Sequence, residues 1–286
     1  MNGIVIVDKP QEWTSQDVTA RLRRVFNTRR IGHGGTLDPM ATGVLPVFVG
    51  RATRGVEFFE HAEKTYEATL LLGTTTDTED TSGTVLEKKE VHISETEFLS
   101  ILPRFRGKIM QVPPMYSALK INGQKLVDLA RKGKTVERQA REIEIFELSC
   151  VEFSGTTARL RVRCSKGTYI RTLCKDIGEA LGCGGCMAAL RRVQAGEYTI
   201  AEAVPLQTLL DAEDPAQYLR AVDSMFRNYP AVTLSPKQEK CCRNGAAFSM
   251  TLEDGTYRCY SKGGEFLSLS KAEDGVMSTI KSFFEV

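Results

Sequence analysis

The residues best suited to chemistry gather in one short stretch, 31–47, which reads I-G-H-G-G-T-L-D-P-M-A-T-G-V-L-P-V. Its glycines let the backbone turn sharply and approach another molecule closely. Pro39 has a fixed φ and pushes Asp38 toward an extended conformation. The carboxylate of Asp38 is therefore predicted to stand on a stiff, bent loop and not on a helix. A carboxylate held in this way suits nucleophilic or general-base chemistry.

Two other interpretations of this loop stay open on the residues alone. In the first, Asp38 accepts hydrogen bonds from nearby N–H groups and only shapes a turn. In the second, the glycines cradle a phosphate, although neither G-x-x-x-x-G-K-[ST] nor G-x-G-x-x-G spacing is present. The following run, Val44 to Val49, predicts a buried strand. Pro46 within it favours an edge position or a bulge.

The string G-H-G-G-T-L-D-P-x-A-T-G-V-L-P resembles the signature loop of the TruB family of tRNA pseudouridine synthases. The resemblance implies that Asp38 is the catalytic aspartate and that His33 displaces the target base. The pattern D-K-P-x-x-x-T-S, which begins at Asp8, is similar to the family's first motif. There the Lys-Pro segment, here Lys9 and Pro10, supports the catalytic loop. We place His33 and Lys9 among the substrate-binding residues.

Two further strings resemble motifs of the same family. The pattern K-x-Y-x-A at 64–68 is similar to the second motif, whose tyrosine, here Tyr66, stacks on the target base. Stacking on an aromatic ring contributes about 1–3 kcal/mol, comparable to the few kcal/mol needed to flip a nucleotide. The string K-G-T-Y-I-R-T-L at 166–173 closely matches the third motif, whose arginine, here Arg171, pairs with the catalytic aspartate. Tyr169 and Leu190 are expected to line the pocket.

The position of Arg171 also predicts an ionic contact, independently of the resemblance. The stripe Ile170, Leu173, Cys174, Ile177 and Leu181 predicts a helix that Gly182 ends. Arg171 would lie near the N-terminus of this helix, where the helix macrodipole disfavours a cation. An anionic partner is therefore expected, and the resemblance identifies it as Asp38. The alternative is an ordinary arginine on the surface of a helix.

Several elements must position these residues. Strands are predicted by alternating apolar residues, and helices by capping patterns and helical spacing. A polar loop at 73–83 resembles a family segment in which Asp77 and Asp80 shape the loop. Pro113 and Pro114 indicate an extended segment, and Asn122-Gly123 a hairpin turn. The predicted strands are 3–7, 64–70, 143–153 and 157–164, with the last two forming a hairpin; the predicted helices start at Thr14 and at 94, 126 and 170.

The distribution of charge favours a polyanionic partner more than the net charge of +2 does. Residues 101–141 hold ten Lys or Arg and two acids, and residues 158–192 hold eight and two. Such segregation predicts a basic face, although charge runs are usually solvated helix faces. The region 107–134 resembles the family's mobile, basic gripping loop. Phosphate contacts there would give salt-dependent affinity that does not depend on base sequence.

The eight cysteines do not predict a metal site. Cys183 and Cys186 form one C-x-x-C, but a second pair with matching spacing is missing. We interpret the cysteines as small apolar residues in a reducing compartment. The N-terminus lacks the pattern of a signal peptide, and no stretch approaches ~20 apolar residues. The protein is expected to be cytoplasmic.

The predicted fold class is α+β. The resemblance implies the pseudouridine synthase fold, a bent, largely antiparallel mixed sheet flanked by helices, as a catalytic domain at 1–228. A helical, more acidic connector is predicted at 211–228. A small, mostly β module follows at 229–286, similar to a PUA-type RNA-binding module. It would begin with a helix from Ser235-Pro236 to Asn244-Gly245.

The resemblance also implies the reaction, which is isomerisation of uridine to pseudouridine at position 55 in the T loop of tRNA. Nothing is oxidised and no group is lost, so neither cofactor nor metal is expected, and we expect a monomer. Asp38, Arg171 and Tyr66 would be catalytic; His33, Lys9, Tyr169 and Leu190 would bind the substrate. Asp38 could attack the sugar, attack the base or abstract a proton from the sugar. With a reference pKa of about 3.9 it is ionised at neutral pH.

Two functions of other classes compete with this hypothesis. An RNA-binding or RNA-folding factor without catalysis would show the same basic surfaces and C-terminal module. A nucleotide hydrolase would need a cluster of metal-binding carboxylates, which the sequence lacks. The feature that discriminates is Asp38, because a binding protein tolerates its loss and an enzyme does not.

Overall fold

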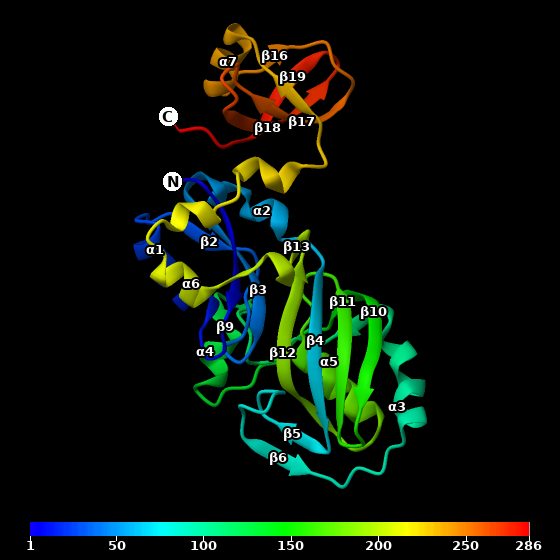
Figure 1. Ribbon diagram of the computed structural model, residues 1–286. Helices are drawn as coiled ribbons and strands as arrows, with labels where there is room; N and C mark the ends of the chain where they lie inside the picture. Colours follow the sequence, from blue (N-terminus) through cyan, green and yellow to red (C-terminus); the bar gives the residue numbers. More distant parts are fainter. Residues whose placement is uncertain (286) are drawn as a thin grey trace.

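The computed structural model describes residues 1–285, which form a ten-stranded sheet with its helices and a smaller five-stranded sheet (Figure 1). The strands of the first sheet lie between residues 3 and 205, and those of the second between residues 231 and 282. Helices and mostly antiparallel strands alternate irregularly along the chain. The predicted α+β fold class is confirmed.

The large sheet is mixed but mainly antiparallel. Only the β1/β14 and β3/β12 pairs are parallel. Two short strands extend the sheet: β2 pairs with β3 and β13 with β12. The main strand order is β14 (Val204–Pro205), β1 (Gly3–Lys9), β3 (Thr42–Val49), β12 (Gly185–Ala195), β4 (Lys64–Leu72), β11 (Thr157–Cys164), β10 (Arg141–Phe153) and β7 (Gly107–Gln111); the additional strands are β2 (Ile31–His33) and β13 (Tyr198–Thr199).

Two helices around this sheet, α1 (Ser15–Val25) and α3 (Glu95–Ile101), begin where their capping residues predict. Thr14 forms a capping box with Asp17 at the start of α1, and Ser94 forms one with Glu97 at the start of α3. Among residues 1–285, no helix is long and apolar enough to cross a membrane. The helices of this part are α1 (Ser15–Val25), α2 (Val56–Phe59), α3 (Glu95–Ile101), α4 (Leu126–Ala130), α5 (Ile170–Ala180) and α6 (Leu206–Asp211), with 3₁₀ turns at Gly50–Gly55, Leu102–Phe105, Ile200–Glu202, Pro215–Tyr218 and Val222–Phe226.

The main core lies between the sheet and helices α1, α3 and α5. Its strand residues come from alternate positions, so that Tyr66, Ala68 and Leu70 of β4 are buried while Glu67 and Thr69 between them are less so. The predicted hairpin of β10 and β11 is present, with Leu160 and Val162 in the core. The sequence pattern thus fixes which face of each strand meets the helices.

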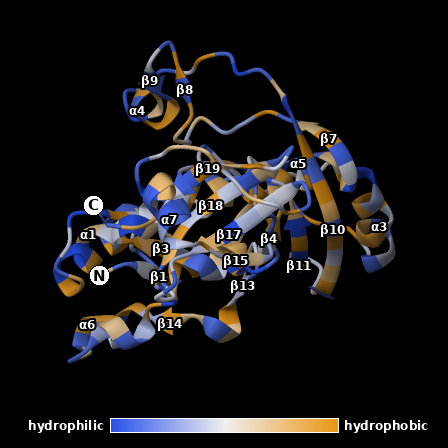
Figure 2. Ribbon diagram, turned by 90° about the horizontal axis from the view of Figure 1, so that it is seen from above, coloured by the Kyte–Doolittle hydropathy of each residue, from blue (hydrophilic) through white to orange (hydrophobic). Residues whose placement is uncertain are grey.

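The segment between β7 and β10 stands away from the sheet. Figure 2 shows β8 (Lys120–Ile121), β9 (Gln124–Lys125) and α4 at a distance from the strands of the sheet. Asn122 and Gly123 connect β8 and β9 with φ values of 49° and 80°, as a type I′ hairpin turn requires. The polar loop predicted at 73–83 begins with a short strand, β5 (Thr74–Thr76), which pairs with β6 (Val85–Lys88).

The expected edge position or bulge at Pro46 is wrong. β3 has neighbours on both sides, and its register with β1 is continuous from Gly3↔Val49 to Lys9↔Gly43. Pro46 pairs with Ile6 on one side, and on the other its carbonyl accepts from the N–H of Gly34 at 2.8 Å. Pro46 is tolerated because β2 ends at His33, opposite Val47, and the ladder of β12 with β3 includes only Thr42 and Gly43. The missing N–H of Pro46 therefore has no ladder partner to lose.

The C-terminal sheet has its own small core. Its strands follow the order β15 (Ala231–Thr233), β17 (Gly255–Tyr260), β18 (Phe266–Glu273), β19 (Val276–Ser282) and β16 (Phe248–Ser249), and α7 (Pro236–Arg243) packs on it. Ser235 caps α7, and Gly245 ends it with a φ of 72°. The predicted helix start and stop are therefore confirmed.

The connector before this sheet is helical only in two 3₁₀ turns. The predicted helix is interrupted because Pro215 is accepted only in the first turn of a helix. Aromatic rings then join the two parts of the chain: Phe226 lies 5.5 Å from Phe283 and 6.0 Å from Phe266, between ring centroids. An ion pair between Lys281 and Glu57 adds a second link.

A test of this packing uses Gly43, which has a φ of 102°. A Cβ at this position would overlap the backbone of Arg192 in β12. Gly43→Ala should therefore lower the free energy of unfolding by more than about 3 kcal/mol. The control is Gly155→Ala, which has a φ of 82° but open space around it and should lose only about 1–2 kcal/mol. Urea denaturation measures both, and equal losses would contradict the steric explanation.

Candidate active site

A cavity of about 850 Å³ lies between the loop at 34–41 and the segment that carries α4. Its wall includes Asp38 from the loop, Tyr66 from β4 and Leu190 from β12, and Tyr169 and Arg171 at the start of α5. These residues come from four separate parts of the sequence. The structure thus brings together most of the residues that the motifs identified.

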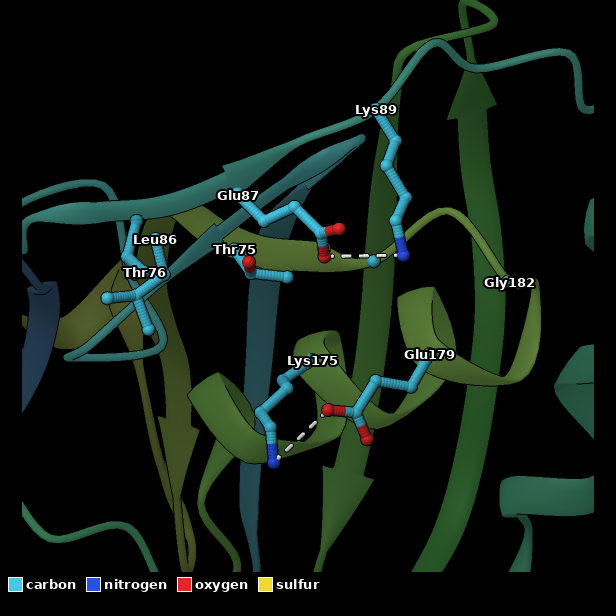
Figure 3. A pocket seen from close by; sticks show the side chains of 10 residues that line it. Thr75, Thr76, Leu86, Glu87, Lys89, Lys175, Glu179 and Gly182 are labelled. Carbon is cyan, nitrogen blue, oxygen red and sulfur yellow. Dashed lines mark ion pairs between the residues drawn. The ribbon is translucent and has the colours of Figure 1, made fainter.

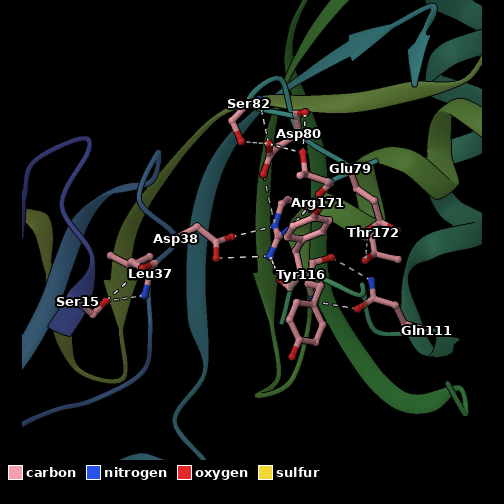
Figure 4. A network of polar contacts seen from close by, with 12 residues as sticks. Ser15, Leu37, Asp38, Glu79, Asp80, Ser82, Gln111, Tyr116, Arg171 and Thr172 are labelled. Atoms are coloured by element: carbon pink, nitrogen blue, oxygen red, sulfur yellow. Dashed lines mark hydrogen bonds and ion pairs between the residues drawn. The ribbon is translucent and has the colours of Figure 1, made fainter. Parts of the chain in front are cut away.

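The predicted ion pair between Asp38 and Arg171 is present. Nε of Arg171 lies 2.9 Å from Oδ2 of Asp38, and Nη2 lies 3.4 Å from Oδ1 (Figure 4). The side chain of Arg171 is only 5% exposed, whereas that of Asp38 is 36% exposed. The buried guanidinium therefore contacts the carboxylate on the side away from the cavity, and the carboxylate stays accessible from the cavity.

Other segments fix the guanidinium in this orientation. Nη1 donates to the carbonyl of Thr78 at 3.0 Å, and Nη2 donates to the carbonyl of Tyr116 at 2.8 Å. Asp80 adds a second carboxylate, with Oδ2 3.8 Å from Nε. These acceptors offset the unfavourable position of a cation at the N-terminus of α5. Arg171 therefore has little freedom to move away from Asp38.

The loop-shaping role predicted for Asp77 and Asp80 agrees with their contacts. Asp77 accepts from the N–H of Thr84 at 2.7 Å. Asp80 accepts from the hydroxyls of Thr78 and Ser82 at 2.8 and 2.5 Å. The contact between Asp80 and Arg171 was not predicted, because nothing in the sequence indicates that this loop reaches the start of α5.

The two tyrosines are held at the cavity in different ways. Tyr66 is 9% exposed, and burial raises the pKa of its phenol. Burial also raises the pKa of Tyr169, whose backbone is clamped by Gln111. The N–H of Tyr169 donates to Oε1 of Gln111 at 2.8 Å, and Nε2 of Gln111 donates to the carbonyl of Tyr169 at 3.1 Å. Both rings are neutral at physiological pH.

His33 ends β2 at the wall of the same cavity. Burial, followed by the positive charge of Arg192, lowers the pKa of its imidazole. Its Nδ1 is buried and has no hydrogen-bond partner among residues 1–285. A neutral ring that fills space at the cavity wall agrees with the position expected for His33.

Lys9 does not line the cavity, and the prediction that it binds substrate is wrong. Its side chain has no exposed surface. Nζ donates to the carbonyls of Pro10, Trp13 and Pro39 at 2.8, 2.6 and 3.3 Å. Burial lowers the pKa of Lys9 to about 8, although Asp38 opposes this shift. Lys9 instead ties the loop that carries Asp38 to β1, as the supporting role of the Lys-Pro segment implied.

Arg192 is the main functional candidate that sequence reasoning missed. It is 1% exposed, and its guanidinium donates to the carbonyls of Val44 at 2.7 Å and Gly35 at 3.0 Å. These two carbonyls lie on either side of Asp38 in the sequence. The alternation of side chains along a strand could have identified it. Arg192 lies two residues after Leu190, so both point from β12 to the same face of the sheet.

The predicted basic face at 158–192 is wrong, because most of its cations are buried or paired with carboxylates. Arg171 and Arg192 are buried, and Arg191 pairs with Asp8 at 2.7 Å. The outward arginines of β11 are matched by glutamates: Arg159 with Glu152, Arg161 with Glu67 and Arg163 with Glu63, at 3.3, 3.5 and 2.6 Å. By contrast, five cations at 120–134 have no ion pair among the described residues: Lys120, Lys125, Arg131, Lys132 and Lys134.

A second cavity, of about 390 Å³, lies between β5, β6 and the C-terminal half of α5 (Figure 3). Its charges are matched in pairs: Lys175 with Glu179 at 3.4 Å and Lys89 with Glu87 at 3.2 Å. Within residues 1–285 no group of His, Cys, Asp or Glu could hold a metal ion, and all eight cysteines are free thiols. The cavity at Asp38 is therefore the better candidate for catalysis.

Comparison with known proteins agrees with the motifs. Residues 23–170 match the N-terminal domain of the TruB family of pseudouridylate synthases, and residues 171–225 match the tRNA pseudouridylate synthase B C-terminal domain. Proteins named tRNA pseudouridine synthase B are similar over nearly the whole chain. That of Clostridium kluyveri is 40% identical over 99% of this chain and 100% of its own, and that of Pseudomonas putida is 42% identical over 96% and 93%.

Solved structures are similar in fold. A chain in the crystal structure of a Cbf5-Nop10-Gar1 complex superposes with a TM-score of 0.73 and is 26% identical, with 99% of this chain and 85% of that chain covered. A chain in the structure of an H/ACA RNP bound to a substrate RNA containing 2'-deoxyuridine gives the same TM-score and coverage at 23% identity.

The anchoring of the Asp38 loop by Arg192 can be tested. Arg192→Met keeps most of the buried volume but leaves the carbonyls of Gly35 and Val44 without donors. Each unsatisfied carbonyl costs about 1–3 kcal/mol, so the loss of both donors should lower the free energy of unfolding by about 2–6 kcal/mol. If Asp38 acts in catalysis, kcat should fall more than a hundredfold while KM changes little.

The matched control for this variant is Arg191→Met. Arg191 is the adjacent residue, is partly exposed and pairs with Asp8, and such pairs contribute about 0–1 kcal/mol. Urea denaturation and steady-state kinetics compare the two variants. Equal effects of the two substitutions would rule out a specific anchoring role for Arg192.

Proposed function

Because the chain belongs to the TruB family of pseudouridine synthases, we propose that it isomerises the uridine at position 55, in the T loop of tRNA. Membership of this family makes the protein an isomerase that forms pseudouridine in tRNA. The position of the uridine, the use of Asp38 and the flipping of the base are the parts that we propose.

The observation that carries the proposal is the ion pair of Asp38 and Arg171 at the wall of a cavity that also contains two tyrosines. The arginine orients the carboxylate, while the partial exposure of Asp38 leaves it accessible to a substrate in the cavity. The cavity has the size of a small-molecule site. A single nucleotide with its ribose can therefore meet the carboxylate there.

The reaction breaks the bond between C1′ and N1 and forms one between C1′ and C5. The base must detach, turn and rejoin, after which C5 gives up its proton and N1 carries one. The overall change is an isomerisation without net gain or loss of atoms. Attack of Asp38 on C1′, attack on the base, and removal of a proton from the sugar all require the carboxylate as an anion. Arg171 serves each route by holding both carboxylate oxygens in a fixed orientation.

A uridine stacked in an RNA loop cannot reach Asp38 unless it leaves the stack. Flipping costs a few kcal/mol, and stacking of the base on Tyr66 returns about 1–3 kcal/mol. Tyr169 and Leu190 would close the remaining sides of the pocket around the base, and His33 would occupy the space that the base leaves. Each of these residues lines the cavity.

Outside the cavity, we propose that the unpaired cations at 120–134 grip the phosphates of the tRNA. Such contacts position the RNA without reading its sequence. The C-terminal module, residues 229–286, would add a second RNA contact to the catalytic domain, residues 1–228. We also propose that the protein acts as a monomer.

The central test is Asp38→Asn, which keeps the size of the side chain but removes its charge. We expect turnover to be lost entirely. The Kd for tRNA should stay within about threefold of the wild-type value, because a carboxylate repels phosphate and its loss removes no attraction to the RNA backbone. Release of tritium from C5-labelled uridine in an unmodified tRNA transcript measures turnover. The control is Asp211→Asn on α6, outside the cavity, which should behave like the wild type.

The competing hypothesis of an RNA-binding factor without catalysis makes the opposite prediction. It requires that wild-type protein binds the transcript but releases no tritium. If the Asp38→Asn variant still releases tritium, the protein is an enzyme, but Asp38 is not required for its reaction.

A second test concerns the ion pair itself. Arg171→Ala should reduce kcat by about 10³-fold or more, the size of effect seen when a group that stabilises charge in an active site is removed. Arg171→Lys keeps a charge but cannot bridge both carboxylate oxygens, so its activity should lie in between. Circular dichroism and tRNA binding establish that each variant is folded. Wild-type turnover in Arg171→Ala would show that the pair is dispensable.

A further inference from the structure

We propose that a second surface of this protein binds phosphates in the double-helical part of the tRNA. We call it the arginine surface, and it consists of Arg21, Arg23, Arg24, Arg29, Arg30 and Arg54. The proposal rests on the proposed function, because it takes tRNA as the substrate. It adds a contact outside both the cavity and the cations at 120–134.

The composition of this region is one-sided. Residues 20–56 contain seven arginines, no lysine and one acid, Asp38, and Asp38 is already held by Arg171. The six arginines of the arginine surface are exposed, and within residues 1–285 none lies at ion-pair distance from a carboxylate. Arginine binds phosphate in a two-pronged geometry that lysine cannot match.

Exposed arginines elsewhere on the molecule are treated differently. On β11, Arg159, Arg161 and Arg163 each face a glutamate of β10, β4 or the turn before β4. Glu285 is the acid near Arg30, and within residues 1–285 it does not form an ion pair with any of the six arginines. Like charges that gather with so few acids repel one another and destabilise the folded chain. The arginine surface carries that cost, which a bound polyanion would offset.

The macrodipole of α1 accounts for only part of the cluster. Arg23 and Arg24 lie in the last turn of α1, where a cation is favoured. Arg29 and Arg30 follow the end of that helix and precede β2, and Arg54 belongs to the 3₁₀ turn at 50–55. A purely structural role therefore leaves most of the arginine surface unexplained.

The arginine surface lies close to the cavity. α1 runs from Thr14, at the cavity wall, toward Arg23 and Arg24, a length of about 16 Å for 11 residues. β2 runs from Arg30 to His33 over three residues, or about 10 Å. Figure 1 shows α1 and β2 near the N-terminus, at one end of the large sheet. An RNA helix with one nucleotide in the cavity would therefore pass within reach of these arginines.

The backbone holds the arginines as one group. The N–H of Thr28 donates to the carbonyl of Arg23 at 3.0 Å, which folds the turn back on α1. The N–H of Gly50 donates to the carbonyl of Arg30 at 2.8 Å, which joins this turn to the segment that carries Arg54. The cations thus belong to one continuous part of the surface.

The chemistry of the arginine surface favours nucleic acid over a protein partner. None of the exposed large apolar side chains lies between residues 2 and 57, whereas stable protein interfaces have an apolar centre. Met1 and Phe58 are the nearest exposed apolar side chains along the chain, and they flank this range without forming a patch within it. A surface dominated by unpaired arginines matches phosphates, whose binding depends on charge and on the release of counterions.

The test compares two triple variants that remove the same charge. Arg23, Arg24 and Arg29 are replaced by Gln in one, and Arg159, Arg161 and Arg163 in the other. The Kd for full-length unmodified tRNA is measured from 50 to 300 mM KCl. If each lost contact removes about 0.9 from the slope of log Kd against log [KCl], the first variant should lose about 2 to 3. Its Kd at low salt should rise about tenfold, with kcat at saturating tRNA unchanged. The control should change the Kd less than twofold.

Two outcomes would overturn the proposal. Equal weakening by both triple variants would assign the effect to net charge alone. Unchanged Kd and salt dependence in the first variant would show that these arginines do not contact the RNA, including the case in which they serve a protein partner. The proposed function fails separately, if wild-type protein releases no tritium, because the binding comparison does not depend on turnover.

Discussion

The organisation of this protein depends on one ion pair, between Asp38 and Arg171. The two residues lie far apart in the sequence, one on a loop without regular structure and the other at the start of a helix. Arg171 is positioned by backbone carbonyls from two further segments, so at least four parts of the chain must fold correctly before the pair can form. Its asymmetry matters for function, because the cation is buried and the carboxylate faces the cavity.

The loop that carries Asp38 is held by buried cations and not by acids. Lys9 donates to the carbonyl of Pro39, and Arg192 donates to the carbonyls of Gly35 and Val44. Burying these charges is costly, and the carbonyls compensate only by hydrogen bonding. Three buried cations, Lys9, Arg171 and Arg192, therefore surround the loop of Asp38, and Asp80 is a second carboxylate beside Arg171. These cations favour a negatively charged substrate such as RNA.

Much of this arrangement could be predicted from the sequence. Capping residues determined where α1, α3 and α7 begin, and alternation in β4 and β11 determined which faces are buried. The motif strings brought together Asp38, Tyr66, Tyr169 and Arg171. These signals are local or belong to a specific pattern, so they survive without knowledge of the tertiary structure.

The errors concern contacts between distant segments. The position of Pro46 depends on where β2 ends and β12 departs from β3, and the burial of Lys9 depends on the return of the loop at Pro39. The arginines of β11 looked like a basic face because the glutamates that match them belong to other strands or to the turn before β4. Charge counted along the sequence does not show which charges are neutralised in space.

Two hydrogen-bonded contacts attach the beginning of the segment between β7 and β10 to the active site. Gln111, the last residue of β7, clamps the backbone of Tyr169, and the carbonyl of Tyr116, five positions later, binds Arg171. A rigid displacement of this segment would disturb the tyrosine and the guanidinium together. The position of the cations at 120–134 is consequently coupled, through Gln111 and Tyr116, to the orientation of Tyr169 and Arg171.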